Sequence, residues 1–277
     1  MKKFLVFMLV LMLLLAGCSA EVAPTEPATE APTEVATEGA TEAPASEVID
    51  TEAKLAAALQ TSGYVELGAS LSLRSSVQMT TDGVFDGCDH TLTAPEYIEG
   101  QTDTENGIAM GGGRLKNITI LGGYRCLGDT TDVPQTGAVR LENVTVDGPN
   151  YALNFGYGNG TEQLIADGSK FFGWSSYTGV AAATFTDCTF GWDSTGAYGN
   201  LRPYVDTILI GCHFEGKTAD DGSTVPFNIS LRENISGITI TLEDCYVGDT
   251  LITQENITEL LNVELFENEI YVSNSEG

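Results

Sequence analysis

Short stretches in which apolar and polar residues alternate recur along the chain from residue 85 onward. Each is rich in β-branched and aromatic residues and is bounded by Gly, Asp or Asn, a pattern typical of strands that end in turns. Each contains a polar residue or glycine, at residues 86, 117, 143, 187, 211, 244 and 267, and a looser copy lies around residue 168. The copies are FDGCDHTL (85–92), LKNITIL (115–121), LENVTVDG (141–148), FTDCTFG (185–191), LIGCHFEG (209–216), LEDCYVGD (242–249) and FENEIYV (266–272).

The spacing of these copies indicates a repeat architecture. Successive polar positions are 23 to 33 residues apart, except for one interval of 44 that the looser copy divides. A unit of this length supplies two or three short strands but no core of its own, which favours a β-solenoid. A propeller would need longer, four-stranded units, and a sandwich would not repeat one strand motif at every step.

A helix is expected before the first strand. Residues 50–61 (DTEAKLAAALQT) offer Asp50 or Thr51 as the N-cap and an apolar stripe of Leu55, Ala58 and Leu59. Gly63 follows as a stop signal. Such a helix would cover the open first turn of a solenoid, because the ends of repeat proteins need a cap.

The helix, the segment VELGASLSL…VFDGCDHTLT and the repeated (N/D)-C/I/V-T-F/I strands together resemble a known family. They are similar to the pectate-lyase-like proteins of the pectin lyase fold superfamily, over roughly residues 50 to 272. The resemblance implies an all-β, single-stranded right-handed parallel β-helix with a short N-terminal capping helix, at residues 50–277. Residues 171–216 are also similar to bacterial β-helix surface proteins. The fold hosts lyases, hydrolases, esterases, adhesins and tailspikes, so it assigns no activity.

The first residues predict export. Lys2 and Lys3 precede an apolar run from Phe4 to Leu15, which is too short to span a bilayer. The next residues, Leu-Ala-Gly-Cys, resemble the bacterial lipobox, which implies a lipoprotein signal peptide at residues 1–17 and lipidation of Cys18. A plain signal peptide with an incidental cysteine is the alternative. The expected location is the bacterial cell envelope, with the chain anchored outside the cytoplasmic membrane by lipid alone.

A stalk is expected between the anchor and the strands, at residues 18–49. Thr-Glu recurs there at residues 25, 29, 33, 37 and 41, and residues 21–52 hold nine acidic residues and no basic one. Such a segment has almost nothing to bury and repels itself, so we expect it to be disordered and extended.

Charge narrows the choice of partners. Residues 53–277 hold 30 acidic and 10 basic residues, a net charge of −20. This excess disfavours nucleic acid, anionic lipid and polyanionic sugars unless cations bridge them. The chain has two histidines, so a histidine-based metal site is not expected.

Cysteines and asparagines recur with the repeat. Cys88, Cys188, Cys212 and Cys245 occupy comparable places, where they would form an inward-facing ladder, a disulfide between successive turns, or a reactive thiol. A reactive thiol would need a nearby histidine or a second cysteine at CxxC spacing, and the sequence has neither. Asn-x-Ser/Thr triplets are explained by asparagines at bends followed by strand-forming threonine. They begin at Asn117, Asn143, Asn159, Asn228, Asn234 and Asn256.

Two tryptophans mark the candidate ligand site. Trp174 and Trp192 lie 18 residues apart, each after Phe-Gly and before a turn that contains a tyrosine. On adjacent strands their rings would lie side by side, either as packing of the outer wall or as a platform for sugar rings. The nearby segment NLRPYVDT adds polar groups. The candidate residues are Trp174, Tyr177, Trp192, Tyr198, Arg202, Tyr204 and Asp206.

Catalysis has weaker support. Among the arginines, only Arg202, in Arg-Pro-Tyr, has a sequence context that suggests the base of a lyase, but the fuller Arg-x-Pro-x-x-Arg motif of such lyases is absent. The Gly-His-Gly motif of the hydrolases is absent too. No metal site is predicted, and calcium is the one cofactor left open, because aspartates in loops can bind it. The aspartates in question are Asp129, Asp132, Asp220 and Asp221.

The sequence therefore predicts noncatalytic recognition of a glycan or another surface polymer, with no nucleic-acid partner. A polysaccharide lyase or glycoside hydrolase acting on a uronic-acid-containing polysaccharide is the first alternative, so whether the chain is an enzyme stays open. An adhesin or envelope scaffold with a protein partner is the second.

Overall fold

The computed structural model describes residues 48–61, 63–79, 83–96 and 106–275. The predicted signal peptide, the stalk as far as residue 47, and Cys18 lie outside the described residues. The chain divides into two units, residues 1–45 and 46–277, and the second holds every described residue. Strands make up 53% and helices 7% of the described residues, which confirms a mainly β chain.

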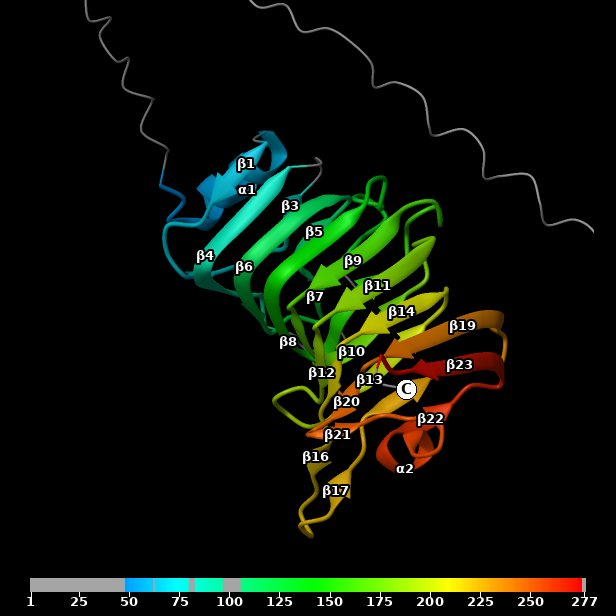
Figure 1. Cartoon of the computed structure of the whole chain (residues 1–277). Helices are drawn as coiled ribbons and strands as arrows, with labels where there is room; N and C mark the ends of the chain where they lie inside the picture. The colour runs from blue at the N-terminus through cyan, green and yellow to red at the C-terminus, as the bar shows by residue number, and fades with distance from the viewer. Residues whose placement is uncertain (1–47, 62, 80–82, 97–105, 276–277) are drawn as a thin grey trace, which may run out of the picture. The chain divides into compact units, whose positions relative to one another are not determined.

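Twenty-one strands form one large, mainly parallel sheet, and their pairings run in three series (Figure 1). In each series a strand pairs with the next strand about one sequence repeat later; Ala183, for example, is opposite Thr207. The first series is β1 (Tyr64–Glu66), the first parts of β4 (Val84–Thr93), β6 (Gly113–Leu121) and β8 (Val139–Phe155), then β9 (Gln163–Asp167), β11 (Ala182–Thr186), β14 (Thr207–Ile210), β19 (Ser236–Glu243) and β23 (Glu267–Ser273).

The other two series reuse the long strands and continue with short ones. The second is β2 (Leu71–Ser72), later parts of β4, β6 and β8, the first part of β10 (Lys170–Tyr177), β12 (Thr189–Gly191), β15 (His213–Phe214) and β20 (Tyr246–Val247). The third is β3 (Val77–Met79), β5 (Asn106–Met110), β7 (Arg125–Gly128), the ends of β8 and β10, β13 (Asn200–Pro203), β18 (Asn228–Ser230) and β22 (Asn262–Glu264).

A residue in the left-handed region of φ turns the chain from the first series into the second. Glycine, asparagine and aspartate tolerate this conformation best. The residues are Asn117, Asn143, Gly168, Asp187, Gly211 and Asp244, with φ between 50° and 61°. Five of the seven polar positions found in the sequence are therefore corners of the chain, and the looser copy at residue 168 belongs with them.

The other two polar positions are not corners. Asp86 comes before an irregular corner in which Cys88 and Asp89 have positive φ, because two extra residues lie between the pairs Asp86–Lys116 and His90–Ile118. Glu267 begins β23 and lies opposite Ser236 at the start of β19, so the copy at 266–272 is a strand of the first series and not a corner.

The residue after each corner points inward, and this explains three of the four repeated cysteines. Cys188, Cys212 and Cys245 directly precede strand residues that pair in register, and all three are fully buried. No cysteine of the described residues forms a disulfide. The thiol contact with Cys188 raises the pKa of Cys212 to about 12, so the Cys212 thiol stays protonated, and all three cysteines pack as core. Cys88 is exposed and lies outside the ladder, contrary to the prediction, because of the irregular corner.

Helices occur near both ends of the described chain (Figure 1). α1 (Glu52–Thr61) buries Leu55 and Leu59 in the core, as the sequence predicts. α2 (Ile257–Leu260) buries Ile257 and precedes β22. Neither helix has the length and apolar character that crossing a membrane requires. Two antiparallel pairs complete the fold: β16 (Lys217–Thr218) with β17 (Thr224–Val225), and β20 with β21 (Thr250–Leu251).

A ladder of polar side chains crosses the first corners. Asn143 Nδ2 donates to Asn117 Oδ1, and Asn117 Nδ2 donates to Asp86 Oδ1, each at 3.1 Å. Lys116 Nζ lies 2.8 Å from Asp86 Oδ2. Partial burial raises the pKa of Asp86, but the hydrogen bonds from Lys116, the Cys88 N–H and Asn117 outweigh burial and lower the pKa to about 2.

We predict that Asp86→Asn lowers the free energy of unfolding at pH 7 by about 1–3 kcal/mol, because it removes a charged hydrogen-bond acceptor. The pKa of Asp86 is lower in the folded chain than its usual 3.8. Its contribution is therefore complete above pH 4 and is lost as the pH falls toward 2. Denaturant titrations at pH 7, 4 and 2.5 measure this, with Asp167→Asn as the exposed control. A deficit that does not shrink in acid contradicts the prediction.

Candidate functional site

Four aromatic rings lie against one another along the third series, and we call them the aromatic column. The rings of Tyr151 and Trp174 are stacked, with centroids 4.9 Å apart. Tyr124 meets the edge of Tyr151 at 5.7 Å, and Tyr198 stacks on Trp174 at 6.2 Å. The column thus runs in the order Tyr124, Tyr151, Trp174 and Tyr198.

Strand register builds the centre of this column. Arg125 in β7 is opposite Tyr151 in β8, Tyr151 is opposite Trp174 in β10, and Trp174 is opposite Asn200 in β13. Parallel strands lie about 4.8 Å apart, so residues in register stack at the distance of two aromatic rings in contact. The residues that directly follow these positions in the four strands are fully buried, so the column belongs to the outer face: Cys126, Ala152, Ser175 and Leu201.

A buried aspartate holds Tyr198 in place. The Asp193 side chain is 4% exposed and accepts hydrogen bonds from Thr195 Oγ1 at 2.6 Å, Ala197 N at 3.2 Å and Tyr198 N at 2.9 Å. These bonds close the loop after β12 upon itself. Asp193 therefore fixes the residue that ends the aromatic column.

Arginines flank the aromatic rings, and we call them the arginine strip: Arg125, Arg202 and Arg232. The guanidinium of Arg202 lies 4.2 Å from the centroid of the Trp174 ring, within the range of a cation–π interaction. Arg125 lies 5.8 Å from the ring of Tyr124, and Arg232 lies 5.9 Å from that of Tyr204.

Arg202 and Arg232 form no ion pair with the acidic groups of the described residues. The ion pairs within the described part of the chain join Lys54 with Asp50, Arg114 with Glu142, and Lys116 with Asp86. None of them involves Arg202 or Arg232. The guanidinium N–H groups of Arg202 and Arg232 are therefore not engaged in ion pairs with carboxylates of the described residues.

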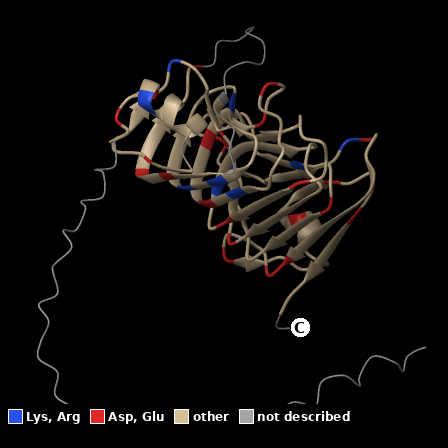
Figure 2. Cartoon of the chain, turned by 90° about the horizontal axis from the view of Figure 1, so that it is seen from above, with Lys and Arg blue, Asp and Glu red and all other residues tan. Residues whose placement is uncertain are grey.

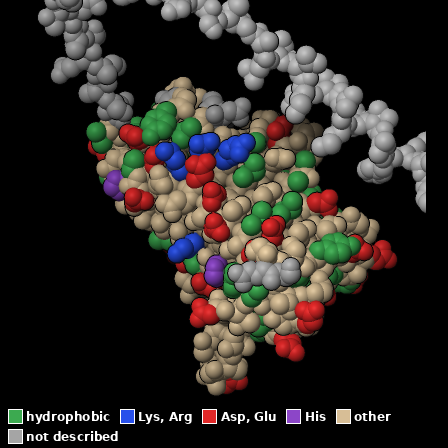
Figure 3. Space-filling model, in the orientation of Figure 1, with side chains coloured by type: hydrophobic (Ala, Val, Ile, Leu, Met, Phe, Trp, Pro, Cys, Tyr) green, Lys and Arg blue, Asp and Glu red, His purple; other side chains and the backbone are tan. Residues whose placement is uncertain are grey.

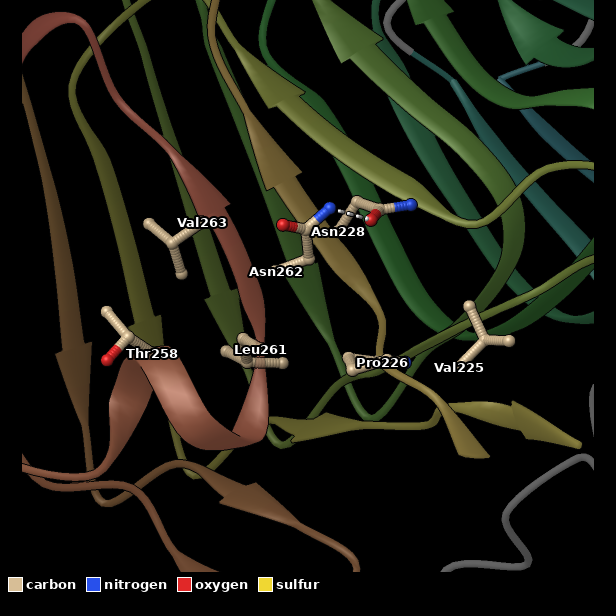
Figure 4. Close-up of a pocket in the computed structure, with 7 residues that line it drawn as sticks. All are labelled: Val225, Pro226, Asn228, Thr258, Leu261, Asn262 and Val263. Carbon is tan, nitrogen blue, oxygen red and sulfur yellow. Dashed lines mark hydrogen bonds between the residues drawn. The ribbon is translucent and has the colours of Figure 1, made fainter. Parts of the chain in front are cut away.

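Asparagines continue the register of the aromatic column. Asn200 is opposite Asn228, and Asn228 is opposite Asn262. Asn262 Nδ2 donates to Asn228 Oδ1 at 2.8 Å, as Figure 4 shows. These two asparagines border an open cavity of about 360 Å³ beside α2. It is lined by Val225, Pro226, Asn228, Thr258, Leu261, Asn262 and Val263.

The structure brings four of the seven predicted ligand residues into this region: Trp174, Tyr198, Arg202 and Tyr204. Trp192 is not stacked on Trp174, because Gly191 pairs with Phe172 and Trp192 then enters the loop after β12. Its ring packs on the backbone of Gly199, where a Cβ would collide with it, and Lys217 Nζ lies 4.0 Å from its centroid.

Two other predicted residues face elsewhere. Tyr177 is fully buried, in register with Phe155 and Pro203, and its hydroxyl lies 3.1 Å from Thr207 Oγ1. Burial raises its pKa, and the side chain cannot meet a ligand at the surface. The Asp206 carboxylate accepts a hydrogen bond from Thr239 N in β19 at 2.9 Å, so it ties the first series together.

Sequence analysis missed Tyr124, Arg125, Tyr151 and Arg232. Arg125 and Tyr151 each come eight residues after their corner asparagine, whereas Trp174 comes six residues after Gly168. A register shift between Phe172 and Trp174 absorbs the difference. Counting from the corners, with an allowance for this shift, would have found the stacked pair.

Of the aspartates considered for calcium, Asp129 and Asp221 already accept hydrogen bonds from the protein with their carboxylates. Asp129 is fully buried and accepts from Gly156 N at 2.6 Å and Tyr157 N at 2.8 Å. Burial raises its pKa, and those N–H groups oppose the rise. Asp221 accepts from the N–H and hydroxyl of Ser223. Asp132 and Asp220 are exposed in loops.

One cluster has donor atoms close enough for a metal ion. The ligand atoms of Glu66, Asp86 and Cys88 lie within 4.8 Å of one another. The Tyr64 hydroxyl donates to Glu66 at 2.7 Å, and Lys116 already pairs with Asp86. Both carboxylates therefore have partners in the protein.

We predict that Asp193→Ala frees the loop after β12 and removes Tyr198 from Trp174. The variant should lose near-ultraviolet circular dichroism and shift tryptophan emission while keeping the strand signal, because only the loop depends on these three hydrogen bonds. Asp221→Ala, which breaks a comparable turn elsewhere, is the matched control. Spectra of Asp193→Ala that match those of the unchanged protein contradict this role.

Comparisons of the chain with protein-family models, curated proteins and solved structures found no match. No relative therefore supplies a substrate, a partner or a set of equivalent residues. The functional argument rests on the aromatic column and the arginine strip.

Proposed function

We propose that this chain is a lipid-anchored surface protein whose right-handed parallel β-helix recognises a glycan or another surface polymer without cleaving it. The three series of parallel pairings, each joining strands about one repeat apart, support the β-helix. The pectin lyase fold superfamily is the family that this proposal implies. Bacterial envelope localisation rests on the basic, apolar and lipobox segments at residues 2–18.

The observation that carries the recognition function is the aromatic column beside the arginine strip. Aromatic rings offer apolar faces and edges to the C–H groups of a sugar, while the hydroxyls of tyrosine bond its hydroxyls. Guanidinium groups donate hydrogen bonds in a fixed fork. The rings follow one another along the third series, and arginines lie at β7, at β13 and after β18 of the same series, which suits a ligand with repeated units.

The exposure of the rings indicates how a ligand would bind. Trp174 has Tyr151 on one side and Tyr198 on another, and Arg202 also lies over its ring. Its faces are therefore covered, and it acts as the support of the column. The ring of Tyr157 lies 5.9 Å from the guanidinium of Arg125, at the same end as Tyr124. Tyr157 and Tyr198 are 39% and 38% exposed and present the surface that a sugar would contact.

Binding is better supported than cleavage. Arginine stays protonated in proteins and donates hydrogen bonds, so Arg202 on the Trp174 ring serves as a ligand contact more readily than as a base. The cation–π contact holds its charge in place. Lyase or hydrolase activity on a polysaccharide is the alternative that the binding experiment also tests.

We predict that Trp174→Ala/Arg202→Ala weakens retention on the polymer that binds the unchanged protein by more than about tenfold, as for the central residues of an interface. Residues 46–277 are passed over immobilised polysaccharides, with and without calcium. Tyr271→Ala is the control, since Tyr271 is an exposed aromatic residue of β23.

Three results would contradict the proposal. Equal retention of the double variant rejects the site, and shortened chains or unsaturated ends after incubation indicate an enzyme. Retention on no polymer, together with a stoichiometric protein partner, indicates an adhesin or scaffold.

The anchor gives a separate prediction. Cys18→Ser removes the thiol that would carry the lipid, so the chain should move from the membrane fraction to the soluble fraction. Immunoblots of fractionated cells measure this, and Cys88→Ser is the matched control because it changes an exposed cysteine of the folded unit. Unchanged membrane association of Cys18→Ser contradicts lipid anchoring.

A further inference from the structure

Two of the three series end in strands with an open edge. β23 pairs only with β19, and β22 pairs only with β18, among the described strands. The second series ends differently, because β21 folds back on β20 as an antiparallel hairpin. In Figure 1 β23 is the last strand of its row.

The direction of the backbone groups of β23 follows from one hydrogen bond. Asp244 N donates to Ser273 O, so Ser273 faces β19. Backbone groups of a parallel strand alternate between its two neighbours, which directs those of Ile270 and Val272 to the open side. Val272 N there meets the side chain of Gln254 at 3.3 Å. The N–H and C=O of Ile270 have no partner among the described residues.

Apolar side chains at this end are only partly covered. Ile270 and Val272 pack against the core but keep some exposure, whereas Ile240 and Leu242, opposite them in β19, are fully buried. One more strand would bury Ile270 and Val272 in the same way. An unpaired edge with apolar side chains is the surface to which extended peptides add as strands.

The charge at this end is strongly one-sided. Residues 233–277 contain ten acidic residues and no lysine or arginine. Glu267 and Glu269 are exposed on the outer face of β23. Figures 2 and 3 agree: acidic positions mark the ribbon around the C-terminal strands in Figure 2, and in Figure 3 acidic side chains lie on that part of the surface while the basic ones lie elsewhere.

The negative charge around β23 determines which kind of strand can pair with its open edge. A second copy would bring the same acidic strand, and the predicted stalk, residues 18–49, has seven acidic residues and no basic one. Both would be repelled, because like charges opposite each other on paired strands are destabilising. An occupant with positive charge is the one that this surface favours, because opposite charges on paired strands stabilise them.

We propose that a basic, extended segment of another polypeptide adds to β23 as a parallel strand. Its Lys or Arg side chains lie beside Glu267 and Glu269 on the outer face. Its apolar side chains, at alternate positions, cover Ile270 and Val272. Its backbone bonds the N–H and C=O of Ile270.

The probe is a fluorescent peptide of alternating basic and apolar residues, Lys-Val-Lys-Ile-Arg-Val-Lys. A peptide with glutamate at the basic positions and a shuffled peptide of the same composition are the controls. Anisotropy titrations use the full-length protein in detergent at two salt concentrations. The alternating basic peptide should bind most tightly and lose affinity in salt, and it should slow amide exchange at residues 267–275.

Two variants test the contacts. Ile270→Pro removes the open N–H, which an edge strand tolerates, and should weaken binding by about tenfold. Glu267→Gln/Glu269→Gln should weaken it by about fivefold through two lost charge pairs. Glu162→Gln/Glu215→Gln makes the same change of net charge away from β23 and should leave binding unchanged.

Several results overturn the proposal. They are equal binding of the basic, acidic and shuffled peptides, no binding of the basic peptide, or exchange protection outside residues 267–275. Equal losses in the two glutamate pairs also overturn it, since binding would then follow net charge alone. The glutamate pairs decide the question if Ile270→Pro unfolds the chain.

Discussion

In-register pairing of parallel strands is the constraint on which this structure depends. Each strand places its side chains about 4.8 Å from the equivalent ones of its neighbour, so one residue type at one position becomes a ladder. Cys188, Cys212 and Cys245 form such a ladder inside the core. Tyr151 and Trp174 form another on the outer face. The same geometry thus produces both the packing and the candidate site.

The corners show how much of this could be predicted from the sequence. A left-handed corner needs Gly, Asn or Asp, and that need makes the repeat visible at Asn117, Asn143 and Asp187. The mainly β class and α1 follow from equally local patterns. These features could be predicted because each depends on a few neighbouring residues and on the steric limits of the backbone.

The candidate site depended on register, which local patterns do not determine. Two extra residues at the first corner expose Cys88, a shift in β10 aligns Trp174 with Tyr151, and the loop after β12 removes Trp192 from the column. Tyr177 follows Trp174 by three residues in β10, and this odd spacing places it on the opposite face, in the core. A one-residue change of register exchanges the faces of a strand, so a motif near a bulge does not fix what its side chains contact.

Charge is distributed unevenly along the parallel strands. Arg125, Arg202 and Arg232 occur where aromatic rings can hold their guanidinium groups, whereas the last 45 residues carry acidic groups only. A ladder of like charges in register would be destabilising. The arginines do not form such a ladder, because they lie at different distances from the corners and over aromatic rings. The glutamates of β23 avoid it because no described strand follows them, so the open edge and its acidity belong together.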